Sequence, residues 1–395
     1  MELETIIGLE IHVHLNTKSK LFCSCRNVSA ADRPNQYVCP VCMGFPGTLP
    51  VTNAQAIEWT ALAGLALGCT IAKHATFARK SYFYPDLPKG YQISQYDEPL
   101  CIHGEAHVFV GDTDRHVRIE RVHLEEDAAK NVHTKDATRI DHNRAGTPLI
   151  EIVTAPDLRS PQEAKMFLEE LQRTMWYLRI SNADMENGDL RVDANISLRE
   201  QGGKLSPKTE IKNLNSFRAV ERALAYEIER QQKLWEAGTP PTTSSTRGWN
   251  DEKGQTVEQR VKEAEADYRY FPEPDIPPLV LEPSWVEKLR IALPELPHAK
   301  EERFRRQYQM APADARLITT DRSLADFAEN VFSEIGEWVA ERPDVEQREI
   351  PLLEKLATNY LLGDFRRLLS DAKATVADRK SVVRMNCVVS CRTSH

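Results

Sequence analysis

The sequence lacks three features that would place it in large classes of protein. No apolar run reaches the ~18 residues that a membrane-spanning helix needs, so we expect no membrane association. Met1 leads directly to Glu2 and Glu4 instead of a basic and then apolar leader, so we expect a cytoplasmic protein. The net charge is −8, and therefore a local basic patch would have to hold any nucleic-acid partner.

Two glycine-rich motifs that bind phosphate are also missing. The chain contains neither G-x-x-x-x-G-K-S/T nor G-x-G-x-x-G. If the protein uses ATP, metal ions and strand side chains have to hold the phosphates in place of a P-loop. The composition itself, with 41% hydrophobic and 28% charged residues in a chain of 395, is typical of a globular protein with two or three domains.

The cysteines indicate a metal site. Four of the eight form two short-spaced pairs, Cys23 with Cys25 and Cys39 with Cys42. Two thiolate pairs separated by a loop can close a tetrahedral zinc site, and four thiolates leave no open position on the ion. The spacing therefore predicts a structural zinc. The alternative, four free or disulfide-bonded thiols, fits the spacing less well.

Residues 7–15 alternate strictly between apolar and polar side chains. Leu9 and Ile11 fall on the apolar side, whereas Glu10, His12 and His14 fall on the other. Period-two alternation predicts a half-buried strand. A carboxylate with two imidazoles is a set of potential metal ligands. The alternative is an ordinary solvated strand face.

Four later segments also have strand patterns with acidic residues on the polar face: 105–127, 147–154, 190–198 and 208–214. Glu151 is the most informative residue, because a charge among apolar neighbours is costly unless it is paired or metal-bound. If these strands are neighbours in one antiparallel sheet, the polar residues converge on one face that binds Mg²⁺ and, through Mg²⁺, a nucleotide triphosphate. This predicted group is Glu10, His12, Glu125, Glu151, Asp193 and Glu210.

The remaining segments give a coarse outline of the fold. Helices are predicted over residues 53–68, from Ser160 onward, and over about 216–238, and residues 239–260 are polar enough to predict a mobile loop. Residues 79–92 and 267–278 both combine aromatic, basic and proline residues. This composition is typical either of packed surface loops or of a clamp that binds a nucleotide or polyanion. Past residue 293 only helical patterns appear, so we expect a domain boundary there.

Longer motifs support a more specific interpretation; they are IGLEIHV (7–13), RKSYFYPDLPKGYQISQ (79–95), HLEEDAAK (123–130), NRAGTPLIEIV (143–153), LRVDANISLR (190–199), TEIKNLNSF (209–217) and ADYRYFPEPDIPPL (266–279). Together they resemble the B subunits of the bacterial and archaeal-type aspartyl/glutamyl-tRNA(Asn/Gln) amidotransferases, over roughly residues 3–375 and in the family's order.

The resemblance implies an α+β fold. A cradle built on an antiparallel sheet and similar to glutamine synthetase is expected over residues 1–292, with a zinc-binding insertion at residues 21–48. An all-α helical domain is expected over residues 293–378. It is expected to be incomplete, because residues 379–395 diverge from the family and the family's tail domain is absent.

The resemblance also implies an activity, that of a glutamine-hydrolysing ligase working with two partners, the glutaminase (A) and the small (C) subunits of the amidotransferase. Such an enzyme phosphorylates the side-chain carboxylate of Glu or Asp mischarged on tRNA(Gln) or tRNA(Asn). Ammonia, channelled from the glutaminase, then displaces phosphate. The expected cofactors are ATP, Mg²⁺ and structural Zn²⁺.

The family's motifs imply roles for individual residues of this chain. His12, Glu125 and Glu151 match Mg²⁺ ligands, and Glu10, Asp193 and Glu210 match acids of the same pocket, for a second ion or for ammonia. The expected substrate-binding residues are Lys80, Tyr82, Tyr84 and Arg269.

Two other functions compete with this interpretation. A Mg²⁺- or Mn²⁺-dependent hydrolase would use His12 with Glu125 and Glu151, without a need for nucleotide. A non-catalytic, zinc-stapled RNA-binding module would explain the cysteines and the aromatic and basic loops, but it leaves Glu151 buried without a reason.

Overall fold

The structure is a computed structural model that describes residues 2–28, 33–261, 268–342, 344 and 346–376. The chain divides into two compact units, Met1–Pro294 and Glu295–His395. Among the described residues, no helix has the length and the apolar character that crossing a membrane requires. The expected divergent tail at residues 379–395 lies outside the described residues.

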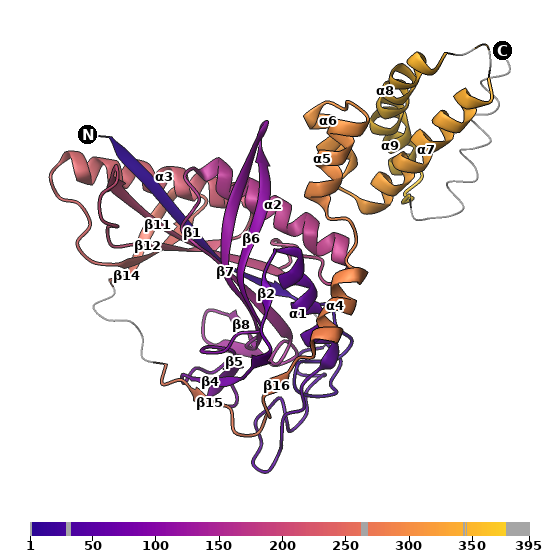
Figure 1. Cartoon of the computed structure of the whole chain (residues 1–395). Helices are drawn as coiled ribbons and strands as arrows, with labels where there is room; N and C mark the ends of the chain where they lie inside the picture. The colour runs from indigo at the N-terminus through magenta and orange to yellow at the C-terminus, as the bar shows by residue number, and fades with distance from the viewer. Residues whose placement is uncertain (1, 29–32, 262–267, 343, 345, 377–395) are drawn as a thin grey trace. The chain divides into compact units, whose positions relative to one another are not determined.

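A large, mostly antiparallel sheet forms the first unit (Figure 1). Within the described residues it has nine strands in the order β14-β13-β12-β11-β1-β10-β7-β6-β2, and only the β12–β13 pair is parallel. Strand β1 lies in the middle, between β10 and β11. The strands are β1 (Leu3–His14), β2 (Thr70–Ile71), β6 (Cys101–Val110), β7 (Thr113–Glu126), β10 (Pro148–Thr154), β11 (Leu190–Glu200), β12 (Thr209–Leu214), β13 (Ser245–Asn250) and β14 (Gln255–Val261).

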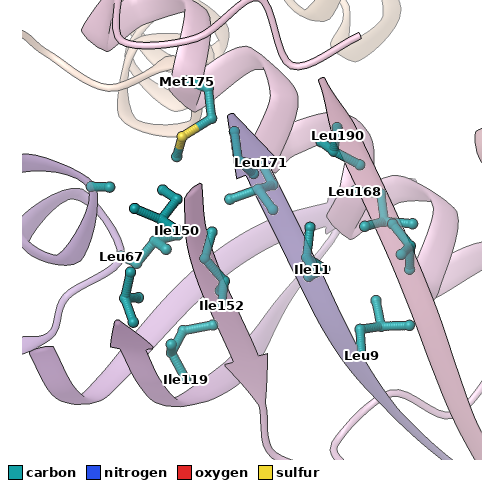
Figure 2. Close-up of a cluster of buried hydrophobic side chains, with 14 of the residues drawn as sticks. Leu9, Ile11, Leu67, Ile119, Ile150, Ile152, Leu168, Leu171, Met175 and Leu190 are labelled. Carbon is teal, nitrogen blue, oxygen red and sulfur yellow. The ribbon is translucent and has the colours of Figure 1, made fainter. Parts of the chain in front are cut away.

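Three helices cover one face of this sheet: α1 (Ala54–Ala66), α2 (Pro161–Leu178) and α3 (Phe217–Glu236). Figure 2 shows Ile11 and Ile152 of the central strands together with Leu168 and Leu171 of α2. The predicted alternation of β1 explains this core, since every second side chain points to the helices. The opposite face of the central strands is left for the polar side chains.

Helix starts follow the expected sequence signals. The Ser160 hydroxyl accepts a hydrogen bond from the Glu163 backbone N–H at the start of α2, and Pro161 occupies the first helical position. At α1 the Asn53 side chain accepts from the backbone N–H groups of Gln55 and Ala56.

Smaller sheets join segments that are distant in the sequence. Strand β4 (Ala78–Ser81) pairs with β5 (Tyr91–Ser94) on one side and with β15 (Phe271–Pro272) on the other. The two aromatic and basic segments therefore meet, and the Arg79 guanidinium bonds Glu273 at 2.6 Å. Two further pairs are β3 (His74–Ala75) with β16 (Leu279–Val280), and β8 (Lys130–His133) with β9 (Thr138–Asp141).

Helix α4 (Pro283–Ala292) ends the first unit, and the second unit is helical in its described residues. The second unit has its own core, which includes Phe304, Ile318, Phe332 and Phe365. Its helices are α5 (Pro297–Gln307), α6 (Pro312–Ile318), α7 (Arg322–Ala340), α8 (Ile350–Tyr360) and α9 (Arg366–Asp371), with a 3₁₀ turn at Gln347–Glu349 and a π-helical turn at Leu361–Phe365.

The expected mixture of helices with a mainly antiparallel sheet is confirmed, but the expected mobile loop at residues 239–260 is wrong. Strands β13 and β14 form a hairpin at the sheet edge. Two of its buried side chains are threonines, which are polar and hid the pattern: Thr246 donates to Glu210 at 3.0 Å, and Thr256 donates to Glu227 of α3 at 3.0 Å. Trp249, which lies opposite Thr256, is also buried. Hydrogen bonding to buried carboxylates replaces the apolar contacts that the sequence pattern would have signalled.

The central strand supplies the first test. Ile11→Ala should lower the free energy of unfolding by about 3 kcal/mol, because Ile11 is completely buried and its removal leaves a cavity. Urea unfolding followed by tryptophan fluorescence measures the change. Val280→Ala is the matched control, since Val280 is 62% exposed on β16. Equal losses in the two variants would contradict the position assigned to Ile11.

Candidate functional site

The pairing of the central strands brings acidic and imidazole side chains together on the polar face of the sheet. His12 of β1 lies opposite Glu151 of β10, and Glu125 of β7 lies opposite Leu149, two residues before Glu151. Opposite residues in antiparallel strands point to the same face. His12 Nε2 consequently lies 3.5 Å from Glu125 Oε1 and 3.4 Å from Glu151 Oε2. One ligand atom from each of the three residues lies within 4.8 Å of the others.

His123 belongs to the same cluster, although the sequence motifs gave it no role. Its Nε2 lies 3.3 Å from Glu151 Oε2 and 3.7 Å from Glu125 Oε2. Its other ring nitrogen, Nδ1, is buried and has no hydrogen-bond partner among the described residues. The sequence shows only that His123 alternates with Glu125 along β7, whereas its position opposite Glu151 comes from the pairing of β7 with β10.

The electrostatics of the cluster favour positive charge. Burial lowers the pKa of His123, but Glu151 and Glu125 outweigh it and raise the pKa to about 9. Burial raises the pKa of Glu151, yet His123 and His12 bring it well below its ordinary value. Two carboxylates in a buried site stabilise a neighbouring cation, whether a protonated imidazole or a metal ion. The donor set of carboxylate oxygens and imidazole nitrogen fits Mg²⁺ or Mn²⁺.

The small sheet supplies further groups. Ser94 of β5 donates to Glu125 Oε2 at 3.1 Å. Lys80 of β4 has a raised pKa: burial lowers it, but Glu125, Tyr270 and Glu151 outweigh that effect. The Lys80 ammonium lies 4.8 Å from the centre of the Tyr268 ring. The Lys80 ammonium is therefore stabilised electrostatically by the carboxylates of Glu125 and Glu151.

The other three expected substrate-binding residues lie in less enclosed positions. Tyr82 packs edge-on against Tyr268, with ring centres 6.0 Å apart. Tyr84 is 56% exposed. Arg269 is also exposed and has a left-handed backbone with φ of 47°. These side chains line the loops rather than the buried part of the cluster.

Glu10, Asp193 and Glu210 share the polar face but form a second group. Glu10 lies opposite Asp193, and the Asn195 amide donates to Glu10 Oε1 at 2.9 Å. The Lys212 ammonium lies 2.5 Å from Asp193 Oδ2 and 3.1 Å from Glu210 Oε1. The structure thus divides the six predicted residues into a histidine-containing group and a second group, in which Lys212 pairs with Asp193 and Glu210 while Glu10 is bonded to Asn195.

A third, cationic group lies further along the same strands. Asp127 is buried and accepts hydrogen bonds from His14 at 2.7 Å and from Arg191, while Arg144 lies 3.3 Å away. Burial would raise the pKa of Asp127, but Arg191 and His14 lower it far below its usual range. A cavity of about 390 Å³ opens here, with Lys130, Arg144 and Arg191 in its wall. Such a cavity can receive an anion.

The four predicted cysteines come together in the structure. One Sγ from each of Cys23, Cys25, Cys39 and Cys42 lies within 4.8 Å of the other three, and all are free of disulfides. A hydrogen bond from Cys23, the Cys39 backbone N–H and the nearby Lys20 ammonium lower the pKa of the Cys42 thiol to about 4, against the effect of burial. Lys20 Nζ is 3.7 Å from Cys42 Sγ. Four converging sulfurs beside a cation that stabilises thiolate fit a tetrahedral zinc ion.

Residues 5–287 match the sequence model of the GatB/GatE catalytic domain, which covers more than half of the chain, so the chain belongs to this family. Curated relatives carry the name of the B subunit of aspartyl/glutamyl-tRNA(Asn/Gln) amidotransferase. The relative from Thermomicrobium roseum is 54% identical over 334 residues, which cover 83% of this chain and 69% of that protein.

Two further relatives agree with this assignment. The one from Dehalococcoides mccartyi is 52% identical over 84% of this chain and 68% of its own length. The one from Thermoanaerobacter pseudethanolicus is 46% identical over 94% of this chain and 75% of its own length. The resemblance of the motifs to this family is therefore confirmed.

The unassigned imidazole gives a prediction. His123→Ala should weaken Mn²⁺ binding at least tenfold. The reason is that the His123 imidazole contacts the carboxylates of Glu125 and Glu151 and keeps them in position as metal ligands. Mn²⁺ titration followed by electron paramagnetic resonance measures the affinity. His133→Ala, at an exposed position on β8, is the control and should bind as the wild type does. Unchanged affinity in His123→Ala would exclude this role.

The cysteine cluster gives another prediction. Cys39→Ser should remove about one equivalent of zinc from metal-washed protein and lower the melting temperature, because a four-thiolate site contributes folding free energy. Elemental analysis and thermal unfolding measure the two effects. Cys69→Ala changes a buried cysteine outside the cluster and should retain the metal. Well under one equivalent of zinc in the wild type would contradict the zinc assignment.

Proposed function

We propose that this chain catalyses the ATP-dependent amidation of Glu-tRNA(Gln), Asp-tRNA(Asn) or both, as the synthetase component of a glutamine-hydrolysing aminoacyl-tRNA amidotransferase. The observation that carries the proposal is the partly buried group of His12, Glu125 and Glu151, with Lys80 beside it, on one face of the central sheet. Membership of the GatB/GatE family supports the same activity.

The reaction has two steps. The side-chain carboxylate of the mischarged amino acid attacks the γ-phosphorus of ATP, and ADP leaves to give an acyl phosphate. Ammonia then attacks the acyl carbon, the C–O bond to phosphate breaks, and the amide and inorganic phosphate are released. Both steps use groups that lower the repulsion between anions and that hold the reactants in line.

His12, Glu125 and Glu151 are proposed to hold Mg²⁺, which would neutralise the phosphate oxygens when bound. His123 is the adjacent side chain that keeps the two carboxylates in position. Ser94 fixes Glu125 through its hydrogen bond of 3.1 Å. These contacts orient the ligand oxygens before any substrate arrives, which reduces the reorganisation that the reaction requires.

Lys80 and the cavity near Asp127 are proposed to receive anionic parts of the substrates. Lys80 adds a positive charge next to the acid group, and Tyr82, Tyr84 and Arg269 extend the binding surface along the loops. Arg144, Arg191 and Lys130 provide cations around the cavity of about 390 Å³. The chain is acidic overall, so these local cations are needed to attract nucleotide and tRNA.

Glu10, Asp193 and Glu210 are proposed to handle a second cation or the ammonia. Ammonium has to lose a proton before it can attack, and a carboxylate next to its path can accept that proton. Lys212 already pairs with Asp193 and Glu210 in this group, so the site is built to bind an ammonium group. Glu10 accepts a hydrogen bond from the Asn195 amide. Among the ion pairs of the described residues, Glu10 contacts Lys208 at 4.0 Å and does not contact Lys212.

We also propose the arrangement of domains and partners. Residues 1–292 would form a cradle similar to glutamine synthetase, with the zinc-binding insertion at 21–48, and residues 293–378 would form a helical domain. The partners would be the glutaminase (A) component, which supplies ammonia, the small (C) component and mischarged tRNA. The relatives are named as one subunit of an amidotransferase, which supports assembly with other subunits.

The decisive test combines two isosteric substitutions in the assembled enzyme. Glu125→Gln and Glu151→Gln should each reduce tRNA-dependent ATP hydrolysis by at least ~10³-fold, because each removes the charge that holds Mg²⁺. The glutaminase activity of the assembly should persist. Glu120→Gln, at an exposed position of β7, should leave both activities unchanged.

The alternatives give different outcomes in the same assay. A metal-dependent hydrolase would turn over without nucleotide, and a non-catalytic RNA-binding module would bind tRNA without tRNA-dependent release of phosphate. Near-normal ATP hydrolysis in either substituted enzyme would show that the corresponding carboxylate is not a metal ligand.

A further inference from the structure

The hairpin of β6 and β7 carries a second cluster of histidine and acidic side chains, far from the group of His12, Glu125 and Glu151. His107 of β6 and His116 of β7 are directly opposite each other, with ring centres 4.2 Å apart. Glu105 lies two residues before His107 and Asp114 two residues before His116, so all four side chains share one face.

The two carboxylates lie at opposite edges of the imidazole pair. Glu105 Oε1 is 3.0 Å from His116 Nδ1 and 3.8 Å from His107 Nε2. Asp114 Oδ2 is 3.1 Å from His107 Nδ1 and 3.7 Å from His116 Nε2. Each imidazole therefore has one nitrogen facing Glu105 and its other nitrogen facing Asp114.

We propose that Glu105, His107 and His116 form a binding site for a divalent transition-metal ion of the Zn²⁺ type. One ligand atom from each residue lies within 4.8 Å of the other two, so a small closure of the side chains brings all three to a common ion. Two imidazole nitrogens and one carboxylate oxygen suit zinc and copper better than Mg²⁺. Water would complete the coordination.

Asp114 supplies the independent argument for a metal site. Imidazole ligands of metals usually donate their other N–H to a carboxylate, which fixes the tautomer and the ring orientation. Here Glu105 faces one nitrogen of each ring, and Asp114 faces the other nitrogen of each ring, with a hydrogen bond of 3.1 Å to His107 Nδ1 and a distance of 3.7 Å to His116 Nε2. Ordinary surface ion pairs do not require that both rings turn one nitrogen toward the same carboxylate and the other nitrogen toward a second carboxylate.

The hairpin can hold this arrangement because its other face is packed. Ala106, Val108, Val117 and Ile119 are buried, and β6 contacts α2. The cluster itself remains open, with 39% of the His107 side chain and 51% of the His116 side chain exposed. Figure 1 shows the hairpin extending along the sheet away from the small sheet of β4 and β5. His116 and His123 are seven residues apart on β7, which is about 23 Å at ~3.3 Å per residue, so the two clusters are separate sites.

The test counts zinc equivalents bound by the full chain and compares each variant with the wild type, so that zinc held by other groups, such as His12, Glu125 and Glu151, cancels in the difference. His107→Gln and His116→Gln should each bind one equivalent fewer than the wild type at micromolar free zinc, whereas the Cys39-containing site is unaffected. His133→Gln changes an exposed histidine outside this cluster and is the matched control. Melting temperatures in metal-free buffer establish that the variants are folded.

A spectroscopic measurement makes the outcome specific. Cu²⁺ added to wild type that holds zinc only at its cysteines should give paramagnetic resonance hyperfine splitting from two imidazole nitrogens, and each of the two hairpin variants should lose one of them. If His107→Gln and His116→Gln bind as much zinc as the wild type, or if His133→Gln loses the same equivalent, the proposal is wrong.

Discussion

The register of β1 between β10 and β11 is the constraint on which the candidate site depends. It places His12 opposite Glu151 on one side and opposite Arg191 on the other. A shift of one residue would turn Ile11 to the polar face and His12 into the core. Burial of Ile11 against the helices therefore also specifies the orientation of His12. Core packing and the geometry of the cluster of His12, Glu125 and Glu151 are two consequences of a single register.

Charge balance is the second constraint, because the sheet gathers many acids on one face. Each group of acids has its own cations: His12 and His123 for Glu125 and Glu151, Lys212 for Asp193 and Glu210, and Arg191 with Arg144 for Asp127. An unpaired buried carboxylate would cost several kcal/mol, so this partition permits many acids in one region. It also separates the group that contains His12 and His123 from the group that pairs with Lys212 and from the cationic cavity. Three chemically distinct positions on one face suit a reaction that joins a nucleotide, a carboxylate and ammonia.

The loops complete this face from two distant parts of the chain. Pairing of β4 with β15 joins the segments near residues 80 and 270, so that Lys80 and Tyr268 lie together. The cysteine cluster gathers four sulfurs from a different segment, whose described residues 23–28 and 33–42 contain no helix or strand. A zinc ion at these sulfurs would restrain the segment where few apolar side chains are available, because ligand bonds can replace a hydrophobic core.

Much of this protein follows from the sequence alone. Alternation identified the strand over residues 7–15 and its polar face, the position of Glu151 among apolar residues signalled a paired or liganded charge, and the cysteine spacing indicated a four-sulfur site. These features are local, since each depends on the period of a strand or on the length of a loop. The longer motifs identified the family as well.

Only the tertiary structure decided which strands are neighbours and which acids share a cation. His123 joins the cluster because β7 pairs with β10, and Lys212 pairs with Asp193 and Glu210 apart from that cluster; neither contact is encoded in local periodicity. The hairpin of β13 and β14 was missed because two of its buried positions are threonines bonded to Glu210 and Glu227, which lie elsewhere in the chain. A polar residue is a good core residue only when its partner is present, and the partner's position is a property of the whole fold.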